Sequence, residues 1–509
     1  MSDMPATDPI ETVETEPVIS TEADDFERLH PLTIVLKTVA AASQNLIAMG
    51  VLYFSVFDRN IIYTLLAAIS LMAVITGISA LVWSRFTYHV GPTEIRIKSG
   101  LFQRNNRSIP FDRIQDVSLE QKLVSRLLGL ATVKLETGAS AGEDGKLDAL
   151  ALNDAQALRD LLRDYKSGLV AGSGTATGIA AEKTVIPPLF AMDSRRIFIA
   201  GLFNFSFVLL AILGAIAQNL DFLIPSEYFD PWYWADRFSE REVIHSIGLT
   251  AQIAGAVGAL FSLIFIGVGS GLVRTFVREH GFRLDRVDTG QPGFRRRRGL
   301  LTLTDMVMPI HRVQAAIIAT GPVREYFGWY HLKLQSLAGD PSGETDHSAA
   351  PCARPEEFAP ILSETNIAGP TDEILFQSVN AAFWWRDAVI MFLILMTVAI
   401  IGGLHVHPGV FAAMLLAVPA IAIMYLNWRR HRFVLSGNQL FVRRGWWRRR
   451  LTILPIRKIQ TADISQSPLD HPLDLATLTL GVAGGTSLAP LRISAIPLNQ
   501  AHALRAQLI

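Results

Sequence analysis

The sequence has little charge and almost no cysteine. Of its 509 residues, 18% are charged, whereas an average soluble domain has roughly 25%. The single cysteine, Cys352, excludes an intrachain disulfide and a zinc site built on several cysteines. Acidic and basic residues number 46 each, so the net charge gives no indication of a nucleic-acid ligand. The low charge and the 50% hydrophobic content indicate a membrane protein instead.

Motifs of common enzymes are also missing. The sequence has no HExxH, no P-loop and no dinucleotide-binding glycine fingerprint. His405 and His407 are close together, but a chance pair explains them more simply than a metal site does. No extended stretch interleaves aromatic and basic residues as a single-strand nucleic-acid binder does. We therefore expect no enzyme, no cofactor, no metal site and no nucleic-acid partner.

The N-terminus lacks the basic start and short apolar run of a secretory signal. The first thirty residues contain nine acidic side chains and one basic side chain, Arg28. This composition predicts a disordered acidic tail.

Six apolar runs are long enough to cross a bilayer, which takes about 20 residues. They occur in pairs, which predicts three membrane hairpins. A buried core helix is the alternative for each run, but the lengths and the pairing argue against it. The runs cover residues 34–56, 61–83, 197–219, 246–273, 387–405 and 408–427.

Basic residues follow the second run of every pair. Because Lys and Arg are enriched on the cytoplasmic side, we expect both termini and the large polar segments in the cytoplasm. These basic residues are Arg85, Arg274, Arg278, Arg429, Arg430 and Arg432.

The polar segments behind the three hairpins are repeats of one another. Each has a glycine, a proline ten residues later and a glutamine five residues after the proline. The motif reads IPFDRIQ, MPIHRVQ and LPIRKIQ, and a second block (LGLATVKL, FGWYHLKL, LDLATLTL) follows at equal spacing. Equal spacing in three copies predicts three related domains. The repeat-defining positions are Gly100, Pro110, Gln115, Gly299, Pro309, Gln314, Gly445, Pro455 and Gln460.

Alternating apolar residues before the glycine and after the glutamine predict antiparallel strands. We expect each motif proline at a strand start or edge, since proline cannot donate a ladder hydrogen bond. Ile114, Val313 and Ile459 should point into the core. NDAQALRDLL and NQAHALRAQL, at the ends of the first and third copies, have helical spacing and predict a closing helix.

A hairpin followed by a G-L…IP-x-x-[RK]-I-Q-x-V…LGLATV pattern resembles the bacterial pleckstrin-homology-like (PH-like) domain of YdbT-like membrane proteins. The resemblance covers nearly the whole chain outside the acidic tail and the linkers. It implies a bent β-barrel capped by a helix for each copy, and it supplies no catalytic residues. It also implies a smaller membrane protein with one such domain as a partner. Asp474 stands in the third copy where the LGL block of the first copy has its glycine, Gly129.

The predicted fold class is an integral membrane α-helical protein, with six transmembrane helices as three hairpins, plus three cytoplasmic PH-like domains. Each domain is expected to be a β-barrel or sandwich capped by a C-terminal helix. The predicted boundaries are 1–30 for the tail; 31–84, 191–276 and 384–428 for the hairpins; 85–166, 277–366 and 429–509 for the PH-like domains; and 167–190 and 367–383 for the linkers.

Basic residues around the motif proline are the candidate contacts for lipid phosphate or a partner's acidic group. Two clusters, residues 295–298 and the arginines flanking Trp446 and Trp447, are expected on the same turn of the fold. Each juxtamembrane base contributes about 1 kcal/mol against an anionic leaflet. Positive-inside topology explains part of this charge, and a solvated strand charge is the alternative at the motif. The candidates are Arg107, Arg113, Arg295, Arg296, Arg297, Arg298, Arg312, Arg443, Arg444, Trp446, Trp447, Arg448, Arg449, Arg450 and Lys458.

Two functions from different classes fit these features. The first is a bacterial inner-membrane scaffold or adaptor whose PH-like domains bind partner proteins or anionic phospholipid. The resemblance places its output in cell-envelope homeostasis or antimicrobial stress resistance. The second is a lipid or peptide transporter component whose domains regulate a path between the helices. Asn45 and Asn204, two polar residues in the apolar runs, are either interhelical hydrogen-bond partners or part of that path.

Overall fold

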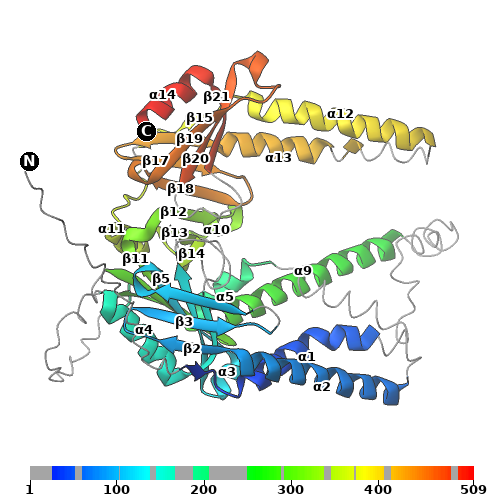
Figure 1. The fold of residues 1–509 in the computed structure, drawn as a ribbon. Helices are drawn as coiled ribbons and strands as arrows, with labels where there is room; N and C mark the ends of the chain where they lie inside the picture. Colours follow the sequence, from blue (N-terminus) through cyan, green and yellow to red (C-terminus); the bar gives the residue numbers. More distant parts are fainter. Residues whose placement is uncertain are drawn as a thin grey trace, which may run out of the picture.

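The protein consists of three β units with helix pairs that all extend to the same side (Figure 1). It is described by a computed structural model. The described residues are 26–51, 60–101, 104–137, 145–166, 187–205, 249–287, 292–336, 346–371, 374–405, 414–415, 417–482 and 491–508. The predicted acidic tail up to residue 25, most of the linker 167–190 and the loop 220–242 lie outside them.

Three described helices are long and apolar enough to cross a membrane: Ile61–Arg85, Ile253–Glu279 and Ala382–Leu404, with mean hydropathies of 2.4, 2.2 and 2.4. Large apolar side chains on them are exposed, among them Phe265 at 80%. Since water does not tolerate such a surface in a folded monomer, a bilayer is its natural environment. They belong to α2 (Ile61–Arg85), α9 (Leu249–Glu279) and α12 (Ala382–His405).

Each of these helices packs beside a second one, as the hairpin prediction requires. The second helices are α1 (Thr33–Val51), α5 (Ser194–Leu202) and α13 (Ala417–Arg430). Of the expected helix 197–219, residues 197–202 are helical, but α5 ends at Leu202 and residues 203–205 are not helical. The remainder of that run lies outside the described residues, so six complete spans stay a prediction.

Two glycines of α9 let the chain that follows α5 come close to this helix. A Cβ on Gly271 would lie 1.7 Å from the Asn204 carbonyl oxygen, and one on Gly267 would lie 2.2 Å from the Phe205 ring. The Asn204 amide donates to the Thr275 hydroxyl at 2.9 Å. Residues 204 and 205 thus approach α9 closely at these two glycines. At Gly255 and Gly258 a Cβ would meet no described atom within 4 Å.

The first β unit contains a four-stranded sheet and three strands of a second sheet. The first sheet has β1 (Glu27–Arg28), β2 (Thr87–Val90), β3 (Glu94–Ser99) and β4 (Asn105–Pro110). The second has β5 (Ile114–Lys122), β6 (Leu130–Thr137) and β7 (Gly145–Ala151), with α3 (Leu123–Leu127) inside it and α4 (Leu152–Lys166) after it.

The second unit repeats this order. Its strands are β8 (Phe190–Ala191), β9 (Arg283–Val287), β10 (Gly293–Arg298), β11 (Thr302–Pro309), β12 (Val313–Thr320), β13 (Tyr330–Ser336) and β14 (Asp346–Ala353). Its helices are α10 (Pro322–Tyr326) and a short closing helix, α11 (Ala359–Glu364).

The third unit has the same seven strands. They are β15 (Gln377–Ser378), β16 (Arg432–Ser436), β17 (Gln439–Arg444), β18 (Arg449–Pro455), β19 (Ile459–Ser465), β20 (Leu475–Val482) and β21 (Leu491–Pro497). Its closing helix is α14 (Leu498–Leu508). The closing helix predicted from the spacing is therefore confirmed in the first and third units.

Each membrane helix pair is inserted between the first and second strands of a unit. The short strands β1, β8 and β15 precede the helices and pair antiparallel with β2, β9 and β16, which follow them. Glu27 and Arg28, assigned to the acidic tail from composition, form β1. A two-residue strand has no periodicity, so sequence patterns cannot reveal it.

The motif glycines and core residues behave as predicted. Gly100, Gly299 and Gly445 have φ values of 112°, 114° and 81°, a conformation that favours glycine. Ile114 and Val313 are buried, and Ile459 is partly buried against the core of the third unit.

The position expected for the prolines is wrong in part. Pro110, Pro309 and Pro455 are the last residues of β4, β11 and β18 rather than the first. Each precedes a single 3-10 turn: Phe111–Arg113, Ile310–Arg312 or Ile456–Lys458. Their φ values of −61°, −63° and −63° are those of the proline ring, so the residue ends the strand at little cost.

The sheets run from one unit into the next. The last three strands of the first unit and the first four of the second form one seven-stranded sheet, ordered β7-β6-β5-β11-β10-β9-β8. The second and third units share another, ordered β14-β13-β12-β18-β17-β16-β15. The apolar core of the second unit likewise includes Phe441 and Ile453 from the third. The three repeats are therefore one continuous stack of β-structure.

Candidate functional site

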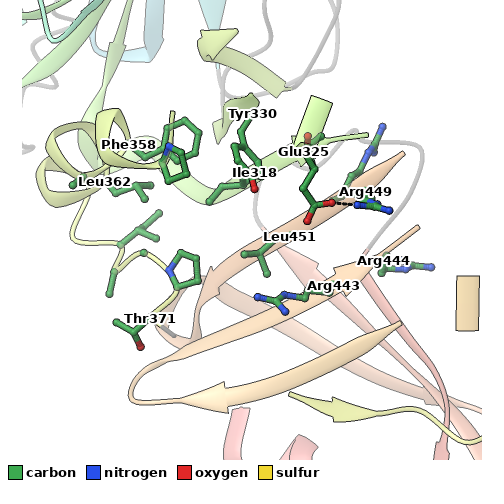
Figure 2. Close-up of a pocket in the computed structure, with 18 of the residues that line it drawn as sticks. Ile318, Glu325, Tyr330, Phe358, Leu362, Thr371, Arg443, Arg444, Arg449 and Leu451 are labelled. Carbon is green, nitrogen blue, oxygen red and sulfur yellow. Dashed lines mark ion pairs between the residues drawn. The ribbon is translucent and has the colours of Figure 1, made fainter. Parts of the chain in front are cut away.

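The joint between the second and third units contains a cavity of about 700 Å³ (Figure 2). β12 of the second unit pairs with β18 of the third at this joint. Ile318, Phe358, Leu362 and Leu451 give the cavity an apolar wall. We call this cavity the seam site.

Five arginines line the seam site, and they come from three elements of the third unit. Arg430 is the last residue of α13, and the others lie at the facing ends of β17 and β18. Glu325, from α10 of the second unit, is the only carboxylate among the lining residues. The arginines are Arg430, Arg443, Arg444, Arg449 and Arg450.

Glu325 compensates only part of this positive charge. Its carboxylate forms an ion pair with Arg449, drawn in Figure 2, and lies 3.6 Å from Arg430. The Arg443 guanidinium lies 3.8 Å from the centre of the Phe376 ring, a cation–π contact that leaves its charge uncompensated.

Two of these arginines are partly buried and lie near other basic groups. Burial lowers the pKa of Arg443, and the neighbouring Arg430 and Arg432 lower it further. Burial also lowers the pKa of Arg444, with added repulsion from Arg492 and Arg450. Both guanidinium groups stay charged at neutral pH because the ordinary arginine pKa is above 12. An anion in the seam site would relieve this repulsion.

The seam site lies beside the ends of the third helix pair. The backbone N–H of Trp446, in the turn between β17 and β18, donates to the Asn427 side chain of α13 at 2.8 Å. The Trp446 and Trp447 rings are 5.7 Å apart, and Trp447 is 61% exposed. This geometry holds an aromatic turn beside the end of α13.

A second cavity, of about 380 Å³, lies on the helix side of the same arginines. Arg444 and Arg450 line both cavities, and Arg448 and Asp387 line only this one. His431 contributes no charge at neutral pH, because burial and the nearby Arg444 lower its pKa to about 4. A continuous basic surface thus runs from the seam site to the ends of α12 and α13.

Residues 295–298 do not join this surface, and their expected position on a turn is wrong. They lie within β10. Arg298 is buried and forms an ion pair with Glu279 at 3.1 Å, and Arg296 is also buried. Arg295 donates to Asp305 at 2.8 Å. Paired or enclosed guanidinium groups hold the unit together, and only Arg297 of the four is exposed.

Asp305 also connects the first and second units. Arg159 of α4 lies 3.3 Å from its carboxylate. The two guanidinium neighbours, Arg295 and Arg159, lower the pKa of this largely buried carboxyl group despite the opposing effect of burial. At this joint two guanidinium groups share one carboxylate, whereas five arginines and one carboxylate line the seam site.

The basic residues of the motif itself also lie away from the seam site. Arg113, Arg312 and Lys458 end the 3-10 turns after the prolines. Lys458 donates to the His311 carbonyl at 2.9 Å and so connects the same turn of two successive units. Arg107 lies on β4 of the first unit and is exposed.

Two of the motif glutamines differ in their surroundings. The Gln314 amide donates to the carbonyl of Arg312, in the preceding 3-10 turn, at 2.9 Å. Gln460 is exposed.

Most of the lining residues outside the basic cluster were not identified from the sequence, among them Glu325, Tyr330 and Phe358. These three belong to the second unit, whereas the basic cluster belongs to the third. Only the pairing of β12 with β18 brings them together, and the repeat spacing carries no sign of that pairing. Arg430 was noticed solely as a positive-inside residue.

Apolar helices in side-by-side pairs and three repeated β units, each with a closing helix, define a membrane protein with tandem PH-like domains. The chain belongs to the bacterial PH domain family, whose model matches residues 35–166, 208–366 and 389–509. It is similar to the UPF0699 transmembrane protein YdbT of Bacillus subtilis (strain 168). The identity is 21% over 486 residues, 92% of this chain and 94% of the relative. No solved structure matches the chain.

Proposed function

We propose that the protein is an inner-membrane scaffold whose seam site binds the headgroup phosphate of an anionic phospholipid. The observation that carries this proposal is the excess of five arginines over one carboxylate around a cavity at the ends of a membrane helix pair. Arginine suits phosphate because its planar guanidinium donates two parallel hydrogen bonds. The apolar wall formed by Phe358, Leu362 and Leu451 suits the start of an acyl chain.

The orientation belongs to the same proposal. Arg85, Arg278 and Arg430 stand at the β-unit ends of α2, α9 and α13. Because basic residues favour the cytoplasmic side, we place the β units in the cytoplasm. Anionic lipid is abundant on that leaflet and attracts basic juxtamembrane groups.

The hydrogen bonds of Asn204 and Asn45 favour a scaffold over a transporter. The Asn204 amide donates to Thr275 of the neighbouring helix, and the Asn45 amide donates to the Ala41 carbonyl of its own helix at 2.7 Å. Both amides make hydrogen bonds that stabilise the helices, so these residues are better explained as structural than as part of a substrate path. The continuous β stack gives the scaffold a rigid body. We propose that the scaffold functions in homeostasis of the cell envelope.

Replacing Arg443 and Arg444 with glutamine is expected to reduce binding of phosphatidylglycerol by about 10- to 30-fold. This corresponds to about 1 kcal/mol for each basic residue near an anionic headgroup. The measurement is native mass spectrometry of detergent-purified protein titrated with phosphatidylglycerol or phosphatidylcholine. Glycerol phosphate, which lacks acyl chains, separates a lipid site from a site for soluble phosphate esters.

The matched control is Arg297→Gln with Arg457→Gln. It removes the same charge from two exposed positions outside the seam site. We expect the control to retain wild-type binding. Equal losses in the two double variants, or no preference for phosphatidylglycerol in the wild type, would show that the seam site is not the binding site.

A further inference from the structure

The way in which successive units are joined leaves one open sheet edge at each end of the stack. β5 pairs with β11, and β12 pairs with β18. The equivalent strands at the two ends are β4 in the first unit and β19 in the third. Among the described strands, β4 pairs only with β3 and β19 only with β20.

Both internal joints have the same register when residues are counted from the motif prolines. Thr304, five residues before Pro309, pairs with Glu120, ten residues after Pro110. Arg450, five residues before Pro455, pairs with Ala319, ten residues after Pro309. The same strand pairing, in the same register, therefore occurs at both joints.

We infer that β19 of one molecule pairs with β4 of a second copy of this chain, in this same register. This register places Asn105 of one molecule opposite Ser465 of the other, and Arg107 opposite Asp463. Opposite charges directly across an antiparallel pair stabilise it, whereas like charges there are destabilising. A self-complementary charge pair at the position dictated by the internal joints argues for a second copy.

The exposure of the two strands also fits this inference. The first four residues of β4 are exposed, while the equivalent residues of β11, which β5 covers, are partly or fully buried. The first six residues of β12 are buried, whereas β19 has four exposed residues. Open edges of this kind are templates for strand addition.

The addition of further molecules by this pairing is compatible with the membrane. The three helix pairs extend to the same side of the stack (Figure 1), so adding a molecule by the same joint keeps all helices in one bilayer. Head-to-tail contacts of this heterologous type generate rings or filaments rather than closed dimers. The inference does not depend on lipid binding at the seam site.

Disulfide trapping tests this pairing. Two differently tagged copies, both carrying Cys352→Ala to remove the native buried cysteine, are co-expressed, one with Arg107→Cys and the other with Asp463→Cys. After mild oxidation of membranes, we expect a heterodimer containing both tags. Asn105→Cys with Ser465→Cys is a second in-register pair, which covers the case in which the first pair of variants does not fold.

The control places Asn105→Cys against Thr461→Cys. Both positions are exposed, but they are four residues out of register. Four residues of strand span about 13 Å, too far for a disulfide, which needs Cα atoms about 4.4–6.8 Å apart. We expect at least about 10-fold less heterodimer. Equal yields for the two designs, no in-register product, or cross-linking of residue 463 to a different protein would overturn the inference.

Discussion

Glu279→Ala is expected to lower the free energy of unfolding by about 3–5 kcal/mol. Glu279 is the last residue of α9, and its carboxylate lies 3.1 Å from the Arg298 guanidinium of β10. The two side chains are only 9% and 5% exposed. Removing the carboxylate leaves a buried guanidinium without its partner, which costs more than the pair contributes to stability. Denaturant unfolding of the detergent-solubilised protein, followed by tryptophan fluorescence, measures the effect.

Asp285→Ala is the matched control. It removes a carboxylate from an ion pair of similar length, 2.7 Å to Arg283, whose side chains are 28% and 47% exposed. Exposed pairs contribute less than about 1 kcal/mol, so the control should unfold nearly as the wild type does. An Asp285→Ala variant as unstable as Glu279→Ala would contradict the role assigned to burial.

Gly299→Ala is expected to destabilise the second unit by more than about 3 kcal/mol. Gly299 has a φ of 114°, and a Cβ at this position would lie 1.9 Å from the Thr302 carbonyl oxygen. That oxygen belongs to the backbone of β11, so it cannot move without disturbing the strand that joins the first two units. The same unfolding measurement detects the loss.

Gly281→Ala separates backbone strain from this clash. Its φ is 63°, but a Cβ there would meet no described atom within 4 Å. The left-handed conformation alone costs about 1 kcal/mol. If Gly299→Ala were no more destabilising than Gly281→Ala, the close approach to Thr302 would have no energetic role.

The architecture of each repeat was largely predictable, because glycine, proline and alternating apolar residues act locally. The glycine turns, the buried Ile114 and Val313, and the helix that begins at Leu498 follow from short-range rules. The strand β1 was missed because two residues carry no pattern. The four arginines of residues 295–298 were misplaced because a run of one residue type hides the alternation of a strand.

The seam site was only half predictable. The basic cluster of the third unit is plain in the sequence, but Glu325 and Tyr330 are added by pairing between units. Alternation shows that a segment is a strand and which face is apolar, but it does not show which strand lies beside it. The pairing of β12 with β18 was therefore not predictable from the sequence.

Successive units share sheets, so that among the described strands β12 has a neighbour on both sides and β19 has one. Hydrogen exchange of the monomeric, detergent-solubilised protein tests this arrangement by comparing Val313–Thr320 with Ile459–Ser465, equivalent strands of successive repeats. The shared sheet predicts that the β12 peptide exchanges at least about 10-fold more slowly than the β19 peptide. Equal exchange of the two peptides would show that the units are separate domains and would contradict this arrangement.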